Sequence, residues 1–196
     1  MKTILIFDNY DSFTYNLTDL IMKSRPDYNV IVKRNRDIDI LKIDYDVLVI
    51  SPGPMTWKDT GILKELFEEK NIPKEIPTLG ICLGMQFIAG YYGIKVDKIE
   101  KPVHGSQVEI EHLNDPFFKD IPNQFKSVRY NSLGIIDKTD QFKNIDFIAF
   151  EKNSGSVMAL KHKNLPFVGL QYHPESFLSE YGDRTLNNFF KIYVEN

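Results

Sequence analysis

Near its centre the sequence reads Pro77-Thr78-Leu79-Gly80-Ile81-Cys82-Leu83-Gly84, and this stretch predicts a buried strand that turns directly into a helix. The helix is expected over the apolar residues from Met85 to Tyr91. A strand that turns sharply into a helix brings its own backbone close together, and glycine relieves this crowding because it has no Cβ. The spacing Gly-x-Cys-x-Gly is also that of the elbow that presents a nucleophile on a tight turn. The stretch therefore predicts an α/β fold and a candidate nucleophile, Cys82.

Three short apolar runs precede this stretch and predict further strands of the same sheet: Ile4–Phe7, Val30–Val32 and Val47–Ile50. An amphipathic helix is expected between the first two, with Asp11 or Ser12 as its N-cap and Pro26 just beyond its end. Another helix is expected between Thr60 and Lys70. Alternating strands and helices are typical of a parallel sheet.

The second half of the chain differs, because short connections join its apolar runs. These runs predict strands at Gln107–Glu111, Phe147–Glu151, Val157–Lys161 and Phe167–Tyr172. A last helix is expected from about Glu180 to Tyr193. We therefore expect one α/β domain over residues 1–196, with a mostly parallel open sheet flanked by helices and some antiparallel strands in the second half.

Composition limits the class of protein. The 196 residues carry a formal net charge of −3, which gives no electrostatic reason to expect nucleic acid or an anionic membrane as a partner. No apolar run approaches the ~20 residues of a membrane span, and the apolar run near the N-terminus is too short for a signal peptide. The single cysteine cannot form an intramolecular disulfide, so we expect a cytoplasmic protein.

A second motif, Gln171-Tyr172-His173-Pro174-Glu175, offers the base that a cysteine nucleophile needs. In an extended segment, side chains two residues apart point to the same side, so the His173 ring can meet the Glu175 carboxylate. An imidazole can take a proton from the thiol, while a carboxylate holds the ring in one tautomer. Taken separately, each motif has a simpler interpretation. A lone cysteine is more often an inert core residue, and a His-Pro-Glu sequence is more often a solvated turn or a structural salt bridge. Together they favour a catalytic pair.

The loop Ser51-Pro52-Gly53-Pro54-Met55 follows a predicted strand and contains two stiffening prolines. The Gly53 amide and the amide of Leu83, next after the candidate nucleophile, would suit an oxyanion hole. A proline-rich turn without a catalytic role is the alternative.

Six motifs, taken in order, resemble the triad-type (class I) glutamine amidotransferases, and among them the component II subunits of aminodeoxychorismate synthase and anthranilate synthase. The motifs span nearly the whole chain: Ile6–Leu17, Ser51–Pro54, Gly80–Gln86, His104–Gly105, Arg129–Leu133 and Gln171–Ser176. The resemblance implies that Cys82 is the nucleophile, His173 the base and Glu175 the residue that orients it. It implies an oxyanion hole formed by the Gly53 and Leu83 amides. The implied binding residues for glutamine are Gly53, Pro54, Met55, Gln86, Ser132 and Leu133.

Three positions depart from the subgroup. Met85 and Asn131 stand where these subunits usually carry histidine, and Ser106 stands where a lysine usually follows His104-Gly105. Methionine occurs at the first of these positions elsewhere in the class, so catalysis is not affected. We expect Asn131 to alter the partner surface or the coupling to the partner more than the chemistry.

The resemblance implies a glutaminase subunit that hydrolyses L-glutamine through a cysteinyl thioester and supplies ammonia to a chorismate-binding component I synthase. It implies no cofactor in this chain, although the partner synthase of the family uses Mg²⁺. His104, His112 and His162 have no metal-ligand spacing with each other or with Cys82, so no metal site is expected.

Two stretches, Ser51–Thr56 and Phe177–Gly182, slightly favour aminodeoxychorismate synthase and folate biosynthesis. Anthranilate synthase and tryptophan biosynthesis, or a subunit shared by both synthases, remain open. Another class of function is a stand-alone cysteine hydrolase such as a γ-glutamyl hydrolase, and a third is a non-catalytic subunit.

Overall fold

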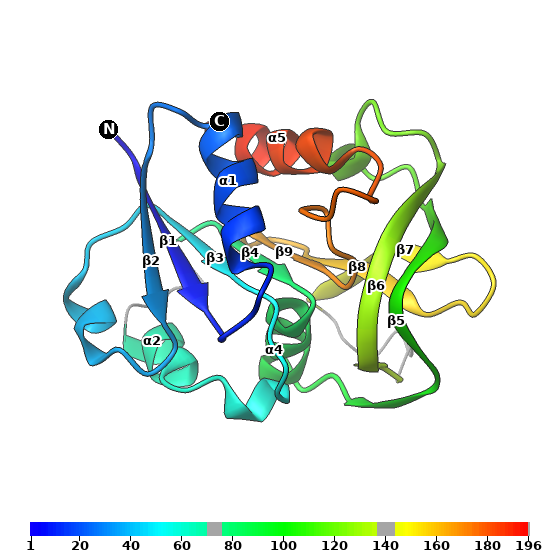
Figure 1. Ribbon diagram of the computed structural model, residues 1–196, viewed down its shortest axis with the longest axis horizontal. Helices are drawn as coiled ribbons and strands as arrows, with labels where there is room; N and C mark the ends of the chain where they lie inside the picture. The colour runs from blue at the N-terminus through cyan, green and yellow to red at the C-terminus, as the bar shows by residue number, and fades with distance from the viewer. Residues whose placement is uncertain (70–75, 137–143, 196) are drawn as a thin grey trace.

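The computed structural model describes residues 1–69, 76–136 and 144–195. Within them, one mixed sheet of nine strands carries helices on both faces (Figure 1). The strands are β1 (Thr3–Asp8), β2 (Asn29–Arg34), β3 (Val47–Ile50), β4 (Thr78–Ile81), β5 (Val96–His112), β6 (Gln124–Ile135), β7 (Ile145–Glu151), β8 (Val157–His162) and β9 (Phe167–Leu170). The helices are α1 (Thr14–Ser24), α2 (Leu63–Glu69), α4 (Leu83–Tyr91) and α5 (Gly182–Tyr193), with short 3₁₀ turns η1 (Ile38–Lys42), η2 (Trp57–Asp59) and η3 (Pro116–Phe118).

The strand order divides the sheet into two halves. The order is β2-β1-β3-β4-β9-β8-β7-β5-β6. From β2 to β9 the four neighbouring pairs are parallel. From β9 to β6 the four neighbouring pairs are antiparallel. The expected α/β fold, with antiparallel strands in the second half, is confirmed, and β9 borders both halves.

The first strand shows why its sequence reads as a continuous apolar run. Ile4 and Ile6 belong to one core, with Leu17 of α1 and Phe189 of α5. Leu5 and Phe7 belong to a second core, with residues of α2 and α4. Successive side chains of a strand point to opposite faces, so a strand between two helical layers needs apolar residues at every position.

The helix boundaries differ from the sequence expectation in detail. The N-cap of α1 is Phe13, and the Asp11 Oδ2 accepts from the Phe13 amide over 2.7 Å, so the prediction of Asp11 or Ser12 as the cap is wrong. The α2 helix begins at Leu63 rather than Thr60, and Lys70 lies outside the described residues. None of the helices in the described ranges is long and apolar enough to cross a membrane.

The sequence reasoning missed strand β6 and saw only the end of β5. In β6 three polar side chains, Ser127, Arg129 and Asn131, are buried. Polar residues at core-facing positions remove the alternation of apolar and polar residues by which a strand is recognised. The missed strand proves important, because it forms one wall of the cavity described below.

Candidate active site

The predicted sharp turn from strand into helix is present at the junction of β4 and α4. Cys82 is the N-cap of α4 and has φ 51° and ψ −99°, a conformation that costs energy for a residue with a side chain. A Cβ on Gly80 would lie 2.5 Å from the backbone of Gly84, and a Cβ on Gly84 would lie 2.6 Å from the Ile50 carbonyl oxygen. The two glycines are therefore required by the close approach of strand and helix.

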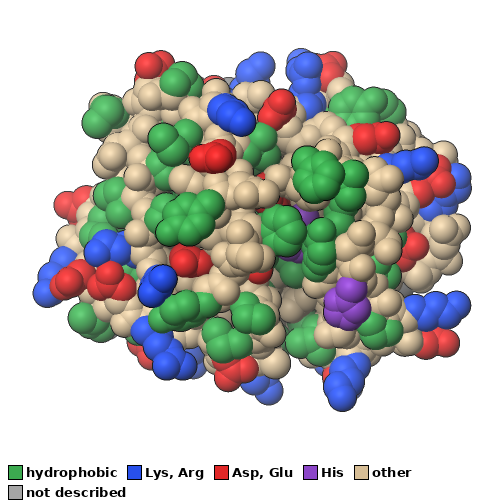
Figure 2. Space-filling view, viewed as in Figure 1, with side chains coloured by type: hydrophobic (Ala, Val, Ile, Leu, Met, Phe, Trp, Pro, Cys, Tyr) green, Lys and Arg blue, Asp and Glu red, His purple; other side chains and the backbone are tan. Residues whose placement is uncertain are grey.

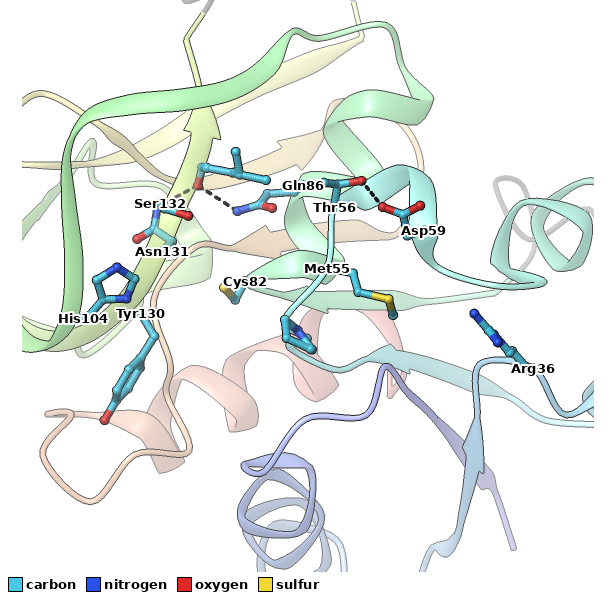
Figure 3. Close-up of a pocket in the computed structure, with 13 residues that line it drawn as sticks. Arg36, Met55, Thr56, Asp59, Cys82, Gln86, His104, Tyr130, Asn131 and Ser132 are labelled. Atoms are coloured by element: carbon cyan, nitrogen blue, oxygen red, sulfur yellow. Dashed lines mark hydrogen bonds between the residues drawn. The ribbon is translucent and has the colours of Figure 1, made fainter.

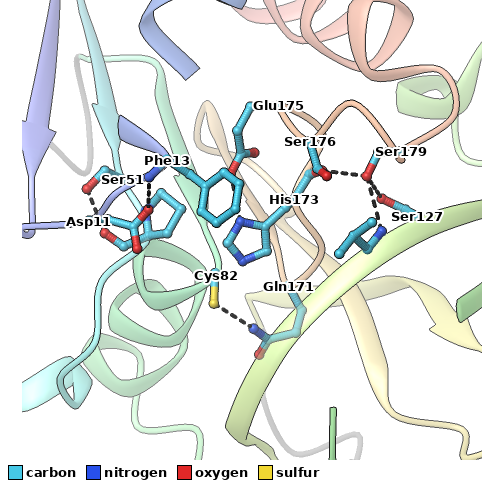
Figure 4. A network of polar contacts seen from close by, with 12 residues as sticks. Asp11, Phe13, Ser51, Cys82, Ser127, Gln171, His173, Glu175, Ser176 and Ser179 are labelled. Atoms are coloured by element: carbon cyan, nitrogen blue, oxygen red, sulfur yellow. Dashed lines mark hydrogen bonds and ion pairs between the residues drawn. The ribbon is translucent and has the colours of Figure 1, made fainter. Parts of the chain in front are cut away.

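His173 and Glu175 meet through a turn. Strand β9 ends at Leu170, and the Ser176 amide donates to the His173 carbonyl over 3.2 Å. The expected extended segment is therefore wrong. The side chains nevertheless meet, since His173 Nδ1 and Glu175 Oε1 are 2.7 Å apart. In Figure 4 the His173 ring lies between Glu175 and Cys82.

The surroundings of His173 favour its protonated form. Burial by itself lowers the pKa of His173, but the contacts with Cys82 and Glu175 outweigh burial and raise the pKa to about 10. The ring packs against Phe13 and Tyr130, with centroids 5.8 Å and 5.1 Å away. These two aromatic residues were assigned no role from the sequence, although both lie within the motifs of the resemblance.

Two glutamines connect Cys82 to strand β6. Gln171 Nε2 donates to Cys82 Sγ over 3.4 Å. Gln86 Nε2 donates to Gln171 Oε1 over 3.1 Å and to the Leu133 carbonyl over 2.9 Å. Gln86 was predicted to bind substrate, whereas the role of Gln171 was missed. The sequence feature that could have indicated Gln171 is its position two residues before His173.

The Ser51–Met55 loop packs on the first turn of α4. A Cβ on Gly53 would lie 2.6 Å from Leu83 Cδ2 and 2.7 Å from Asn9 Cβ, so the two expected oxyanion-hole residues are neighbours. Asn9 holds the loop through two hydrogen bonds. Its backbone amide donates to Ser51 Oγ over 2.9 Å, and its side-chain Nδ2 donates to the Ser51 carbonyl over 3.1 Å.

A cavity of about 500 Å³ opens beside Cys82, a size typical of small-molecule sites. In Figure 3 Cys82 lies between Met55 on one side and Tyr130, Asn131 and Ser132 on the other. All the predicted glutamine-binding residues line this cavity: Gly53, Pro54, Met55, Gln86, Ser132 and Leu133. His173 and Glu175 lie outside its lining, but His173 contacts Cys82, which lines the cavity, and Glu175 contacts His173.

Asn131 does not lie on the protein surface. It is 4% exposed, and its Nδ2 donates to the Leu133 carbonyl over 2.8 Å. The part of the expectation that placed Asn131 on a partner surface is therefore wrong, because its side chain is buried in the cavity wall; an effect on the coupling to a partner stays a prediction. No cluster of three or more histidine, cysteine or carboxylate side chains able to hold a metal ion occurs in the described part of the chain.

Comparison with solved structures supports the fold. The chain superposes over its full length on a putative GMP synthase protein from Thermoplasma acidophilum, with a TM-score of 0.82, 24% identity and 95% of that chain covered. A glutamine amidotransferase from Thermotoga maritima gives a TM-score of 0.72 at 19% identity, with 99% of this chain and 83% of that chain covered.

Comparison of sequences identifies the family. The chain is 37% identical over 193 residues to the aminodeoxychorismate/anthranilate synthase component 2 of Bacillus subtilis, covering 97% of this chain and 96% of that protein. It is 39% identical over 192 residues to the anthranilate synthase component 2 of Pyropia yezoensis, covering 96% and 98%. The family model for class I glutamine amidotransferases matches residues 5–193. The chain therefore belongs to the class I glutamine amidotransferase family.

Proposed function

We propose that this chain hydrolyses the side-chain amide of L-glutamine through a thioester on Cys82 and passes the ammonia to a chorismate-using component I synthase. The observation that carries this proposal is the position of Cys82. It lies on a strained elbow at the N-terminus of α4, borders the cavity, and has the buried His173–Glu175 pair beside it. The positive end of the helix dipole and a protonated imidazole both favour the thiolate, which is the nucleophile.

The chemistry follows in two steps. Cys82 Sγ attacks the amide carbon of glutamine, and the resulting oxyanion collapses with cleavage of the C–N bond while protonated His173 gives a proton to the leaving ammonia. Water then attacks the thioester, His173 takes a proton from it, and glutamate leaves as Cys82 is restored. The Gly53 and Leu83 amides would stabilise the oxyanion, each contributing about 3 kcal/mol to lowering the barrier.

The hydrogen bonds of Gln86 indicate which of its atoms meets the substrate. Both hydrogens of its Nε2 are used, one by Gln171 Oε1 and one by the Leu133 carbonyl. Oε1 is therefore the atom that can accept from the ammonium group of glutamine. The Leu133 carbonyl already accepts from Gln86 and Asn131, so Leu133 would contact the substrate through other atoms.

Exposed apolar side chains support a protein partner. Tyr10, Tyr15 and Phe177 are 47%, 70% and 88% exposed. Hydrophobic side chains also gather in the middle of the face shown in Figure 2, beside histidine. Exposed apolar patches mark interaction surfaces. The two related proteins named above are component 2 subunits, and a synthase partner would be the natural occupant of such a surface.

The decisive experiment replaces the nucleophile. In a complex of this chain with a component I synthase, Cys82→Ala should lower glutamine-dependent product formation by about 10⁴-fold. Synthesis from added ammonium salt should be unchanged, because the synthase does not need the glutaminase for free ammonia. Glutamine-dependent synthesis that survives Cys82→Ala would show the proposal to be wrong.

The same complexes decide the pathway. We propose aminodeoxychorismate synthase as the partner, with anthranilate synthase, or both, as the alternative. Co-purification of the chain with each component I, followed by assays for aminodeoxychorismate and for anthranilate, distinguishes these cases. Full glutaminase activity of the isolated chain, with no increase on complex formation, would instead indicate a stand-alone hydrolase.

A further inference from the structure

A buried ion pair lies behind the cavity wall and has no part in the chemistry above. Arg129 of β6 and Glu151 at the end of β7 are joined by Nη1 and Oε2 at 2.8 Å, with side chains 1% and 10% exposed. Ser154 also donates to Glu151 Oε2. Neither Arg129 nor Glu151 is among the described residues that line the cavity.

The pair continues into the cavity through Asn131. Arg129 Nε donates to Asn131 Oδ1 over 2.9 Å, and Asn131 Nδ2 donates to the Leu133 carbonyl over 2.8 Å. The Leu133 carbonyl also accepts from Gln86 Nε2, as the dashed lines in Figure 3 show. Because Arg129 fixes Oδ1, the amide of Asn131 can present only its Nδ2 to Leu133.

Stability alone explains this arrangement poorly. Removing two charges from water costs several kcal/mol per ion, and well-packed apolar residues often replace a buried ion pair without loss of stability. A guanidinium, however, can direct two hydrogen bonds along fixed lines at once, which a lysine ammonium does not do. The geometry at Arg129 thus fixes the orientation of a neighbouring side chain.

We propose that Glu151, Arg129 and Asn131 are positioning residues that hold the Leu133 carbonyl and the Gln86 side chain in the geometry needed to bind glutamine. The ion pair fixes the Arg129 guanidinium, the guanidinium fixes the Asn131 amide, and that amide together with Gln86 fixes the carbonyl. This inference rests on the proposed function, because it names residues that support the same glutamine site.

The sharpest test is Glu151→Gln, since this residue acts on the cavity only through Arg129. The substitution keeps the shape of the side chain and removes its charge, so the buried guanidinium loses its counter-ion. We expect the KM for glutamine, measured on the complex with its synthase, to rise about ten-fold while kcat changes less than about three-fold.

Asn131→Asp tests the next link. The carboxylate still accepts from Arg129, but it presents an oxygen instead of a donor to the Leu133 carbonyl. We expect a similar rise in KM of about ten-fold or more. Asn188 on α5 offers a matched control, because it is 6% exposed and its Nδ2 donates to the Phe117 and Lys119 carbonyls over 2.8 Å and 2.9 Å. Asn188→Asp should lower the melting temperature and leave KM unchanged.

The outcomes separate this inference from the proposed function. If Cys82→Ala abolishes glutamine use but Glu151→Gln and Asn131→Asp keep the wild-type KM, the positioning role is wrong and the proposed function stands. The same holds if the two variants only lose thermal stability, as Asn188→Asp does. If Asn131→Asp does not fold, Glu151→Gln alone decides. If Cys82→Ala retains glutamine use, the proposed function itself fails.

Discussion

The two halves of the sheet support the candidate site in different ways. In the parallel half, β3, β4 and β9 are buried at every position, and the site depends on close approach of backbones around Cys82. In the antiparallel half, β5 extends over 17 residues that are mostly exposed or half-buried. The site there depends on buried polar side chains of β6. The parallel half therefore fixes the position of Cys82 by steric exclusion, and the antiparallel half shapes the pocket by directed hydrogen bonds.

The largest effect should come from adding a methyl group at matched positions of the two halves. A Cβ on Gly80 would meet the backbone of Gly84 at 2.5 Å. A Cβ on Gly134 would have one close contact, with the Ile99 Cγ2 methyl at 2.9 Å, and ordinary contacts with two side chains at 3.7 Å and 3.9 Å. Backbone cannot yield as a side chain can, so Gly80→Ala should lower the free energy of unfolding by about 3 kcal/mol and Gly134→Ala by about 1 kcal/mol or less. Urea unfolding of both variants measures the difference.

The comparison of the halves would be wrong if Gly134→Ala proved as destabilising as Gly80→Ala. A Gly80→Ala variant that unfolds like the wild type would contradict the steric account of the elbow. Gly93 provides a control for the substitution itself, because a Cβ there would meet no heavy atom of the described residues within 4 Å. Its φ of 81° still makes alanine unfavourable, so Gly93→Ala reports backbone strain without a clash.

The next effect concerns His173, which follows β9, the strand that borders both halves. The pKa of His173 is raised to about 10, and the hydrogen bond with Cys82 is one cause. Cys82→Ala should therefore lower the pKa of His173, which an NMR titration of the ring protons measures. An unfolded histidine has a pKa of ~6.5, so protonation of His173 stabilises the fold fully below about pH 6.5. That contribution is lost as the pH rises through about 10.

His162 gives the opposite sign and serves as the control. Burial lowers the pKa of His162, so its contribution to stability is lost as the pH falls. The difference in unfolding free energy between wild type and His173→Gln should shrink towards pH 10. The difference for His162→Gln should shrink towards acid pH. An unchanged pKa of His173 in Cys82→Ala would show that the contact with Cys82 does not contribute.

The smallest effect is expected at the rim of the antiparallel half. Ser132 lines the cavity but is exposed, and we expect it to contact glutamine through its backbone. Ser132→Ala should therefore leave the KM for glutamine within about two-fold of the wild type, since exposed substitutions change free energies by ~0.5 kcal/mol or less. Gln86→Ala, which removes a buried side chain from the same cavity, should raise KM by about ten-fold. Equal effects of the two substitutions would contradict the backbone contact.

The sequence predicted the parallel half well, because the residues that form its strands and its sharp turn are neighbours in the sequence. Continuous apolar runs such as Val47–Ile50 and the glycines around Cys82 report burial and close approach directly. The antiparallel half was harder to predict, because the counter-ion that allows Arg129 to be buried is distant in sequence. Glu151 is 22 positions away from Arg129. The pairing of His173 with Glu175 was predicted from an extended backbone, yet a turn produces it, since residues two apart can meet in both conformations.

One consequence follows from the way His173 is held. Its amide donates to the Val128 carbonyl of β6 over 3.0 Å, and Ser179 bridges the His173 carbonyl and the Val128 amide over 2.6 Å and 3.1 Å. Cys82 is tied to β9 instead, through a 2.7 Å bond from its amide to the Leu170 carbonyl. His173 and Cys82 are thus attached to different strands, β6 and β9, which are not neighbours in the sheet, so the separation of the two side chains depends on where β6 lies relative to β9. A displacement of β6 relative to β9 would therefore separate the two side chains even in a chain that stays folded.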